Sequence, residues 1–99
     1  MPVLNVHLTD GFADDHVIVS VDGTKVFDRA DVTTNKLLGT AASLPPVDVA
    51  ADKAEITLDI PEKGFRGTVS VDLAKGSHVP IALDGMELRH AVMRKIGFA

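Results

Sequence analysis

The chain has 99 residues, of which 45% are hydrophobic and 24% charged, and it contains no cysteine. This composition predicts one globular domain with a single core and argues against a disordered chain or a disulfide framework. The net charge of −4 argues against nucleic-acid binding, because such surfaces need clustered Lys and Arg. No apolar run approaches the roughly 18 residues of a membrane helix, so we expect neither a membrane span nor a signal peptide. A chain without cysteine suits the cytosol and exported bacterial domains alike, which leaves the compartment open.

Alternation of apolar and polar residues dominates the chain and is typical of β-strands with one buried face. It is clearest in residues 54–60, 68–73 and 78–83, whereas helical spacing is scarce. Short strands separated by turn residues favour an all-β fold. We therefore predict a single domain over residues 1–99, built as a small two-layer antiparallel β-sandwich of seven to eight strands. A small barrel is the alternative.

The first two predicted strands, residues 4–8 and 16–21, belong to a three-strand meander over residues 3–28, since consecutive strands usually pair. Their buried faces stay aligned in a register that sets His7 directly across from His16. Directly opposed residues have Cβ atoms about 4.5 to 5.5 Å apart. At this separation, two imidazoles are close enough to share a metal ion.

The loop at residues 9–15 adds carboxylates beside this histidine pair. A divalent metal held by His7, His16, Asp14 and Asp15 is therefore one candidate site, and a metal- or small-ligand-binding domain is the alternative function. The competing interpretation is that both histidines are solvated and that the aspartates form turns by bonding their own backbone.

The pair Asp22-Gly23 predicts a two-residue hairpin turn, because type I′ turns need positive φ at both central residues. In that register Ile18 lies opposite Phe27 on the outer face of the sheet. Two apolar side chains there predict a protein contact or dimer patch, unless the connector or the C-terminal tail covers them. Residues 19–24 resemble hairpins of immunoglobulin-like and transthyretin-like accessory domains, which implies the same class of sandwich.

Residues 29–52 connect this first meander to a second one. They contain Pro45-Pro46 and several small residues, which disfavour regular structure. The short apolar run Leu37-Leu38 is compatible with an edge or crossover strand.

A four-strand meander is predicted over residues 53–92, and its first hairpin carries the strongest pointer to recognition. The buried faces agree if Ile60 opposes Val69, which leaves a loop of several residues. Phe65 and Arg66 lie in this loop between two glycines and belong to residue types enriched at binding hot spots. The competing interpretation is that Phe65 folds back onto the core.

The last hairpin is predicted at Asp84-Gly85, with Leu83 facing Met86. Beyond it, the residues fit both strand and helix spacing, and we favour a strand to about Val92.

No motif in the chain indicates catalysis. No serine lies in a nucleophile elbow, and neither a phosphate-binding glycine loop nor a zincin motif is present, so a small enzyme is the third hypothesis. The absence of Trp and Tyr argues against carbohydrate binding and single-stranded nucleic-acid binding, because both use exposed aromatic side chains for stacking. We therefore expect a non-catalytic binding or accessory module that contacts a protein partner or another copy of itself. The candidate contact residues are Phe65, Arg66, Ile18 and Phe27.

Overall fold

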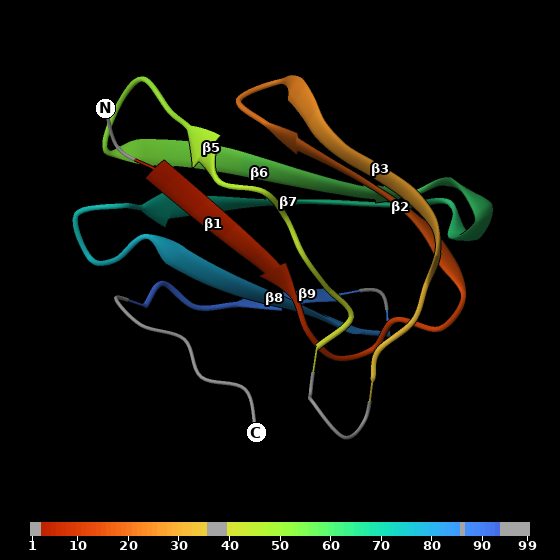
Figure 1. The fold of residues 1–99 in the computed structure, drawn as a ribbon. Helices are drawn as coiled ribbons and strands as arrows, with labels where there is room; N and C mark the ends of the chain where they lie inside the picture. The colour runs from red at the N-terminus through yellow and green to blue at the C-terminus, as the bar shows by residue number, and fades with distance from the viewer. Residues whose placement is uncertain (1–2, 36–39, 86, 94–99) are drawn as a thin grey trace.

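The structure is a computed structural model, which describes residues 3–35, 40–85 and 87–93. Within these residues the chain forms short β-strands and one 3₁₀ turn, η1 (Pro61–Lys63), and is compact, with a Cα radius of gyration of 12.5 Å (Figure 1). The strands are β1 (Val3–Leu8), β2 (Asp15–Val21), β3 (Thr24–Val32), β4 (Ala42–Ser43), β5 (Val47–Asp48), β6 (Lys53–Ile60), β7 (Phe65–Asp72), β8 (His78–Asp84) and β9 (Glu87–His90). None of the described residues belongs to a helix long and apolar enough to cross a membrane.

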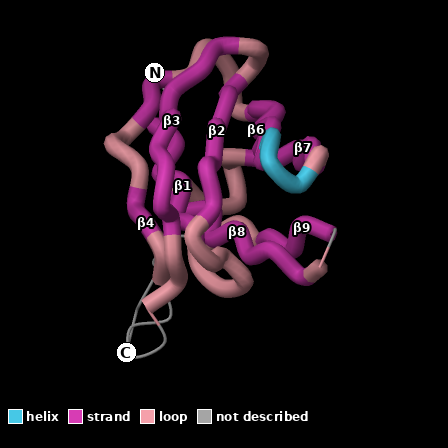
Figure 2. Tube along the Cα trace, turned by 90° about the vertical axis from the view of Figure 1, so that its right-hand side faces the viewer, coloured by secondary structure: helices cyan, strands magenta, loops and turns pink. Residues whose placement is uncertain are grey.

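The strands form two sheets that face each other, so the predicted sandwich is confirmed. One sheet has the order β3-β2-β6-β7, and the other has the order β4-β1-β8-β9 with β5 also paired to β1. Both sheets are open at their ends, which a closed barrel would not be. Figure 2 shows β3, β2, β6 and β7 side by side, with β7 at the margin.

The core lies between the two sheets and is built from every second residue of the long strands. In β6 the inward residues are buried and their neighbours are exposed or half-buried, as the alternation predicts. The largest fully buried side chains come from both sheets: Leu4, Val6, Leu8, Val17, Val19, Ile56, Leu58, Ile60, Val79 and Ile81.

The predicted meander over residues 3–28 is wrong, because β1 and β2 lie in different sheets. β1 pairs parallel to β8 and antiparallel to β4 and β5, whereas β2 pairs with β3 and β6. The chain crosses between the sheets over the end of β8, where the Leu83 N–H donates to the Asp10 carbonyl at 2.8 Å. Gly11 allows this crossing, since a Cβ there would lie 1.7 Å from the Leu83 carbonyl oxygen. Alternation shows that a strand has a buried face, but it does not show which neighbour the strand pairs with.

The turn at Asp22-Gly23 is confirmed, with φ angles of 51° and 85°. The register beyond it differs from the prediction, because the ladder shifts between Val19 and Ser20. This β-bulge inserts one residue into β3, so Ile18 pairs with Asp28 and Phe27 pairs with Val19. The predicted opposition of Ile18 and Phe27 is therefore wrong.

The predicted four-strand meander over residues 53–92 is also wrong, because β6 and β7 lie in one sheet and β8 and β9 in the other. The hairpin between β6 and β7 is tighter than predicted, and the loop between β8 and β9 is shifted by one residue, although the buried faces of these strands are correct. Ile60 pairs with Phe65 instead of Val69, because η1 (Pro61–Lys63) and Gly64 make a compact turn. In the last hairpin Leu83 pairs with Leu88 instead of Met86, which lies outside the described residues. Register slips by an even number of residues keep the same side chains buried, so alternation cannot choose between them.

Two further predictions concern the ends of elements. β9 ends at His90, and Met93 then forms an isolated bridge with His78, so the strand is shorter than the prediction to Val92. Leu37-Leu38 and the tail at residues 94–99 lie outside the described residues.

Candidate functional site

The structure separates the two histidines of the predicted metal site. His7 lies on β1 in one sheet, whereas His16 lies on β2 in the other and donates from Nε2 to Asp28 Oδ1 at 2.5 Å. This bond is the largest cause that lowers the pKa of the Asp28 carboxyl. No group of three or more His, Asp or Glu suited to a metal ion occurs in the part of the chain that the structure describes. The prediction of a His7 and His16 metal pair is therefore wrong.

The two loop aspartates have separate roles. Asp15 is almost fully buried, accepts a hydrogen bond from the Ala13 N–H, and pairs with Lys63 Nζ at 3.0 Å. Asp14 is exposed, and a hydrogen bond to Asp31 raises the pKa of its carboxyl. Asp15 thus anchors η1 to the start of β2, and Asp14 shares a proton-dependent contact with β3.

A different histidine pair forms on the outer face of the β1 and β8 sheet. His7 Nε2 and His78 Nδ1 are 3.1 Å apart, and His7 Nδ1 is 2.9 Å from the Ser43 hydroxyl. The ring centroids are 5.3 Å apart with an interplanar angle of 21°. The distance between the ring centroids is longer than the distance between the two nitrogens, so these nitrogens lie on the sides of the rings that face each other. The two imidazoles therefore share a hydrogen bond, in which one ring nitrogen donates and the other accepts. This bond is lost when both rings are protonated, because neither ring then has an acceptor nitrogen.

Acid is expected to destabilise the domain through this pair. Burial, and then the charge of His78, lower the pKa of His7 below 6.5 in the folded state. As the pH falls, His7 is therefore protonated in the unfolded chain before it is protonated in the folded domain. The contribution of neutral His7 to the free energy of unfolding is thus complete above about pH 6.5 and is lost below it. Melting temperatures measured from about pH 8 to about pH 5 should fall less steeply for His7→Gln than for the wild type. His90→Gln, a change at an exposed histidine, should follow the wild type; parallel slopes for all three proteins would refute this role.

The predicted outer-face apolar patch is not formed. Ile18 is half-buried on that face and pairs with Asp28 on one side and Asp59 on the other. Phe27 packs partly against the core instead, with the Arg29 guanidinium 5.8 Å from its ring centroid. These two residues therefore do not make a common contact surface.

The predicted tip at Phe65 and Arg66 is divided between core and surface. Phe65 is 7% exposed, so it packs in the core as the competing interpretation expected. The Arg66 side chain is 74% exposed, and its Nε lies 3.8 Å from Asp59 Oδ1. Both residues belong to β7, whose free side forms the more informative surface.

β7 is the longest regular strand at a sheet edge. Its eight residues pair with β6 in an uninterrupted register, and it ends the sheet order. At the opposite end of that sheet, β3 is bulged, while in the other sheet β4 has two residues and β9 has four. Among the described residues, no backbone group outside β6 bonds to the backbone of residues 65–71.

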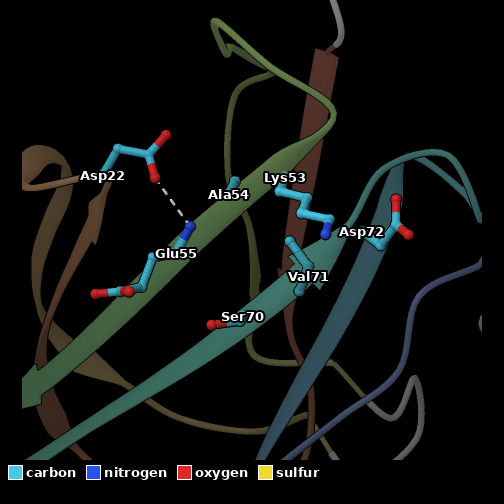
Figure 3. Close-up of a pocket in the computed structure, with 7 residues that line it drawn as sticks. All are labelled: Asp22, Lys53, Ala54, Glu55, Ser70, Val71 and Asp72. Carbon is cyan, nitrogen blue, oxygen red and sulfur yellow. Dashed lines mark hydrogen bonds between the residues drawn. The ribbon is translucent and has the colours of Figure 1, made fainter.

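The direction of each backbone group on β7 follows from the pairing of β6. The Glu55 N–H donates to Asp22 Oδ1 at 2.9 Å and the Asp22 N–H to the Glu55 carbonyl, so the Glu55 backbone faces β2 (Figure 3). Neighbouring residues direct these groups to opposite sides, so Ile56 faces β7 and bonds its partner Val69. Backbone N–H and C=O groups therefore point away from β6 at the even-numbered residues Arg66, Thr68, Ser70 and Asp72.

Two surface hollows flank this free edge. The groove between β7 and β9 has a volume of about 390 Å³ and is lined by Phe65, Arg66, Gly67, Thr68, Val69, Glu87 and Leu88. The hollow in Figure 3 has about 490 Å³ and is lined by Asp22, Lys53, Ala54, Glu55, Ser70, Val71 and Asp72. Every residue of β7 thus lines one of the two. In Figure 3 the side chain of Lys53 extends toward Asp72, and three carboxylates accompany this one ammonium group.

Gly67 shapes the groove by leaving room for Leu88 of β9. A Cβ at Gly67 would lie 2.7 Å from Leu88 Cδ1 and 3.0 Å from Phe65 Cζ. Sequence analysis identified Phe65 and Arg66 but missed the edge itself, because strand order is a long-range property. Two features of the sequence could have indicated the edge. One is a glycine within a strand pattern, and the other is that residues 65–73 contain no Lys or Pro, the residues that protect many edge strands.

Comparisons of the chain with protein-family models, with curated proteins and with solved structures gave no match.

Proposed function

We propose that this protein is a non-catalytic binding module that accepts an extended segment of a protein partner along β7. The observation that carries the proposal is the free edge of β7, which has eight residues in regular register and no backbone partner beyond β6 over residues 65–71 in the described chain. Such an edge is a template for another strand. An accessory role of the immunoglobulin-like or transthyretin-like kind is compatible with this mode of binding.

Backbone hydrogen bonds would supply the affinity of this interaction. The N–H and C=O groups of Arg66, Thr68 and Ser70 are available to an antiparallel or parallel partner strand. Each such bond contributes about 0.5 to 1.5 kcal/mol net. A few bonds with the accompanying side-chain contacts are enough for a specific but reversible interaction.

The two hollows would supply the selectivity. Side chains of an added strand alternate between the two faces, so every second one enters the groove between β7 and β9, beside Phe65, Val69 and Leu88. The others lie on the outer face, beside the acidic hollow that contains Glu55 and Asp72. The preferred segment therefore alternates apolar residues with polar ones and carries a cation near the hollow.

Ser70→Pro tests this proposal, because it removes one edge-facing N–H and places a ring on the free side of β7. The β6 ladder keeps its bonds, since the Ser70 N–H does not face β6. Phage-displayed random peptides selected on the wild type should bind Ser70→Pro at least about tenfold more weakly, a loss of about 1.4 kcal/mol or more.

Ser70→Ala is the matched control, because it changes the side chain and keeps the N–H. Peptides should bind it nearly as tightly as the wild type, and their binding should slow exchange of the Thr68 and Ser70 amides in the wild type. Equal affinity for Ser70→Pro, protection elsewhere, or a failure to select any peptide would contradict the proposal.

A further inference from the structure

We infer that the segment accepted by β7 is β7 of a second copy of this chain, paired antiparallel about a two-fold axis through Val69. This inference rests on the proposed function and specifies its partner. It follows from the arrangement of charge along the edge.

The edge-facing residues of β7 are self-complementary in this register. Antiparallel pairing centred on Val69 sets Arg66 opposite Asp72 of the second copy and Thr68 opposite Ser70. Thr68 and Ser70 direct free backbone N–H and C=O groups to the edge, so they form the hydrogen-bonded pairs at the centre of the new ladder. The Asp72 carbonyl already accepts a hydrogen bond from the Lys75 N–H at 3.2 Å, so Arg66 and Asp72 are paired through their side chains. The two-fold axis repeats each pair, which gives two Arg-Asp ion pairs and a closed dimer.

Other registers lose this charge match. A shift of two residues in either direction sets Arg66 or Asp72 opposite a neutral residue of β7 or beyond its end. Larger shifts shorten the ladder and finally set Arg66 opposite Arg66 or Asp72 opposite Asp72, and like charges directly opposite destabilise a strand pair. The register centred on Val69 is the one that combines full overlap with both ion pairs.

The side chains of Arg66 and Asp72 are both accessible to a second copy of the chain. Arg66 is largely exposed, and its contact with Asp59 is long at 3.8 Å. Asp72 Oδ1 accepts a hydrogen bond from the Ala74 N–H at 3.0 Å, and the carboxylate lines the hollow where acidic groups outnumber Lys53. Arg66 of the second copy brings a cation to this hollow.

The inward face of the pair is apolar. Val69 lies against Val69 of the second copy, and Gly67 lies opposite Val71. These residues extend the core-facing side of the sheet across the groove beside Leu88. The dimer thus joins two four-stranded sheets into one continuous sheet.

Charge reversal tests the register in the full chain. Arg66→Asp alone and Asp72→Arg alone each set like charges opposite each other twice, so sedimentation equilibrium should show a dimer dissociation constant raised at least about tenfold in each. An equimolar mixture restores both ion pairs in a heterodimer, so it should dimerise about as tightly as the wild type. Melting curves of each variant verify that it is folded.

A cysteine substitution tests the two-fold axis independently. The chain has no cysteine, so Val69→Cys can form a disulfide only with a second copy. Opposed residues of a non-hydrogen-bonded pair have Cα atoms about 4.5 Å apart, which a disulfide spans. Val69→Cys should therefore cross-link under mild oxidation, whereas Ser70→Cys, which lies opposite Thr68, should cross-link far more slowly.

The results separate this inference from the function on which it rests. A wild-type dimer, monomeric single variants and a restored mixture support self-pairing. A wild type that stays monomeric, or variants that dimerise unchanged, overturn self-pairing. If the selected peptides bind the wild type and not Ser70→Pro, the strand-accepting function stands without self-pairing. If they bind both proteins equally, the strand-accepting function is overturned as well.

Discussion

Leu58→Asp is expected to leave the domain largely unfolded. Leu58 has no exposed surface and lies between Val19 of β2 and Gly67 of β7 in the sheet, with its side chain in the core. An unpaired carboxylate there costs several kcal/mol, which is a large fraction of the about 5 to 15 kcal/mol that stabilise a typical domain. Circular dichroism and denaturant titration measure the loss.

Thr57→Asp is the matched control for this change, because it introduces the same carboxylate one residue earlier on the outer face. It removes a 3.2 Å contact between the Thr57 and Thr68 hydroxyls, so a loss of about 1 kcal/mol or less is expected. Equal losses for the two variants would show that the assignment of buried and outer faces in β6 is wrong.

Gly11→Ala is expected to cost about 3 to 5 kcal/mol of unfolding free energy, because it combines a backbone clash with an unfavourable φ angle. Gly11 has a φ of 90°, and a Cβ there would lie 1.7 Å from the Leu83 carbonyl oxygen. The crossing between the two sheets must shift to accommodate the methyl group. Urea titration of both proteins gives the difference.

Gly23→Ala separates these two contributions. Gly23 has a φ of 85° but no atom within 4 Å of the position of a Cβ, so only the backbone strain remains. This variant should lose about 1 to 2 kcal/mol. If Gly11→Ala lost no more than Gly23→Ala, the close approach of the crossing loop to β8 would be refuted.

Alternation and turn residues were sufficient to predict the two-layer sandwich and most of its core. Ile56, Leu58 and Ile60 are buried as predicted, because a two-residue period specifies which side chains share a face. The turn at Asp22-Gly23 was also predicted, since its positive φ angles restrict the residue types that fit. These properties are local, and local properties can be read from neighbouring residues.

Alternation and turn residues did not predict which strands pair or in which register. β1 joins β8 across more than seventy residues, as in the Asn5 and His78 pair, and nothing local to either strand encodes this choice. The bulge that moves Phe27 beside Val19 also depends on its neighbours in the sheet. His7 was therefore assigned the wrong partner, His16 instead of His78.

The candidate site was likewise predicted only in part. Arg66 is exposed at the surface that we propose for binding, while its neighbour Phe65 is buried because the hairpin is tighter than expected. The free edge of β7 became visible only with the strand order. An edge is defined by the absence of a neighbour, and the pattern within a strand carries little information about that.

Amide hydrogen exchange along β7 tests most directly whether this edge is open and accepts a strand. In dilute protein without peptide, the amides of Thr68 and Ser70 should exchange quickly, while those of Val69 and Val71, which bond β6, should exchange slowly. A selected peptide, or a protein concentration that populates the dimer, should slow Thr68 and Ser70 to rates near those of Val69 and Val71. Protection of Thr68 and Ser70 already present in the dilute monomer, or fast exchange that persists in the bound state, would contradict the account.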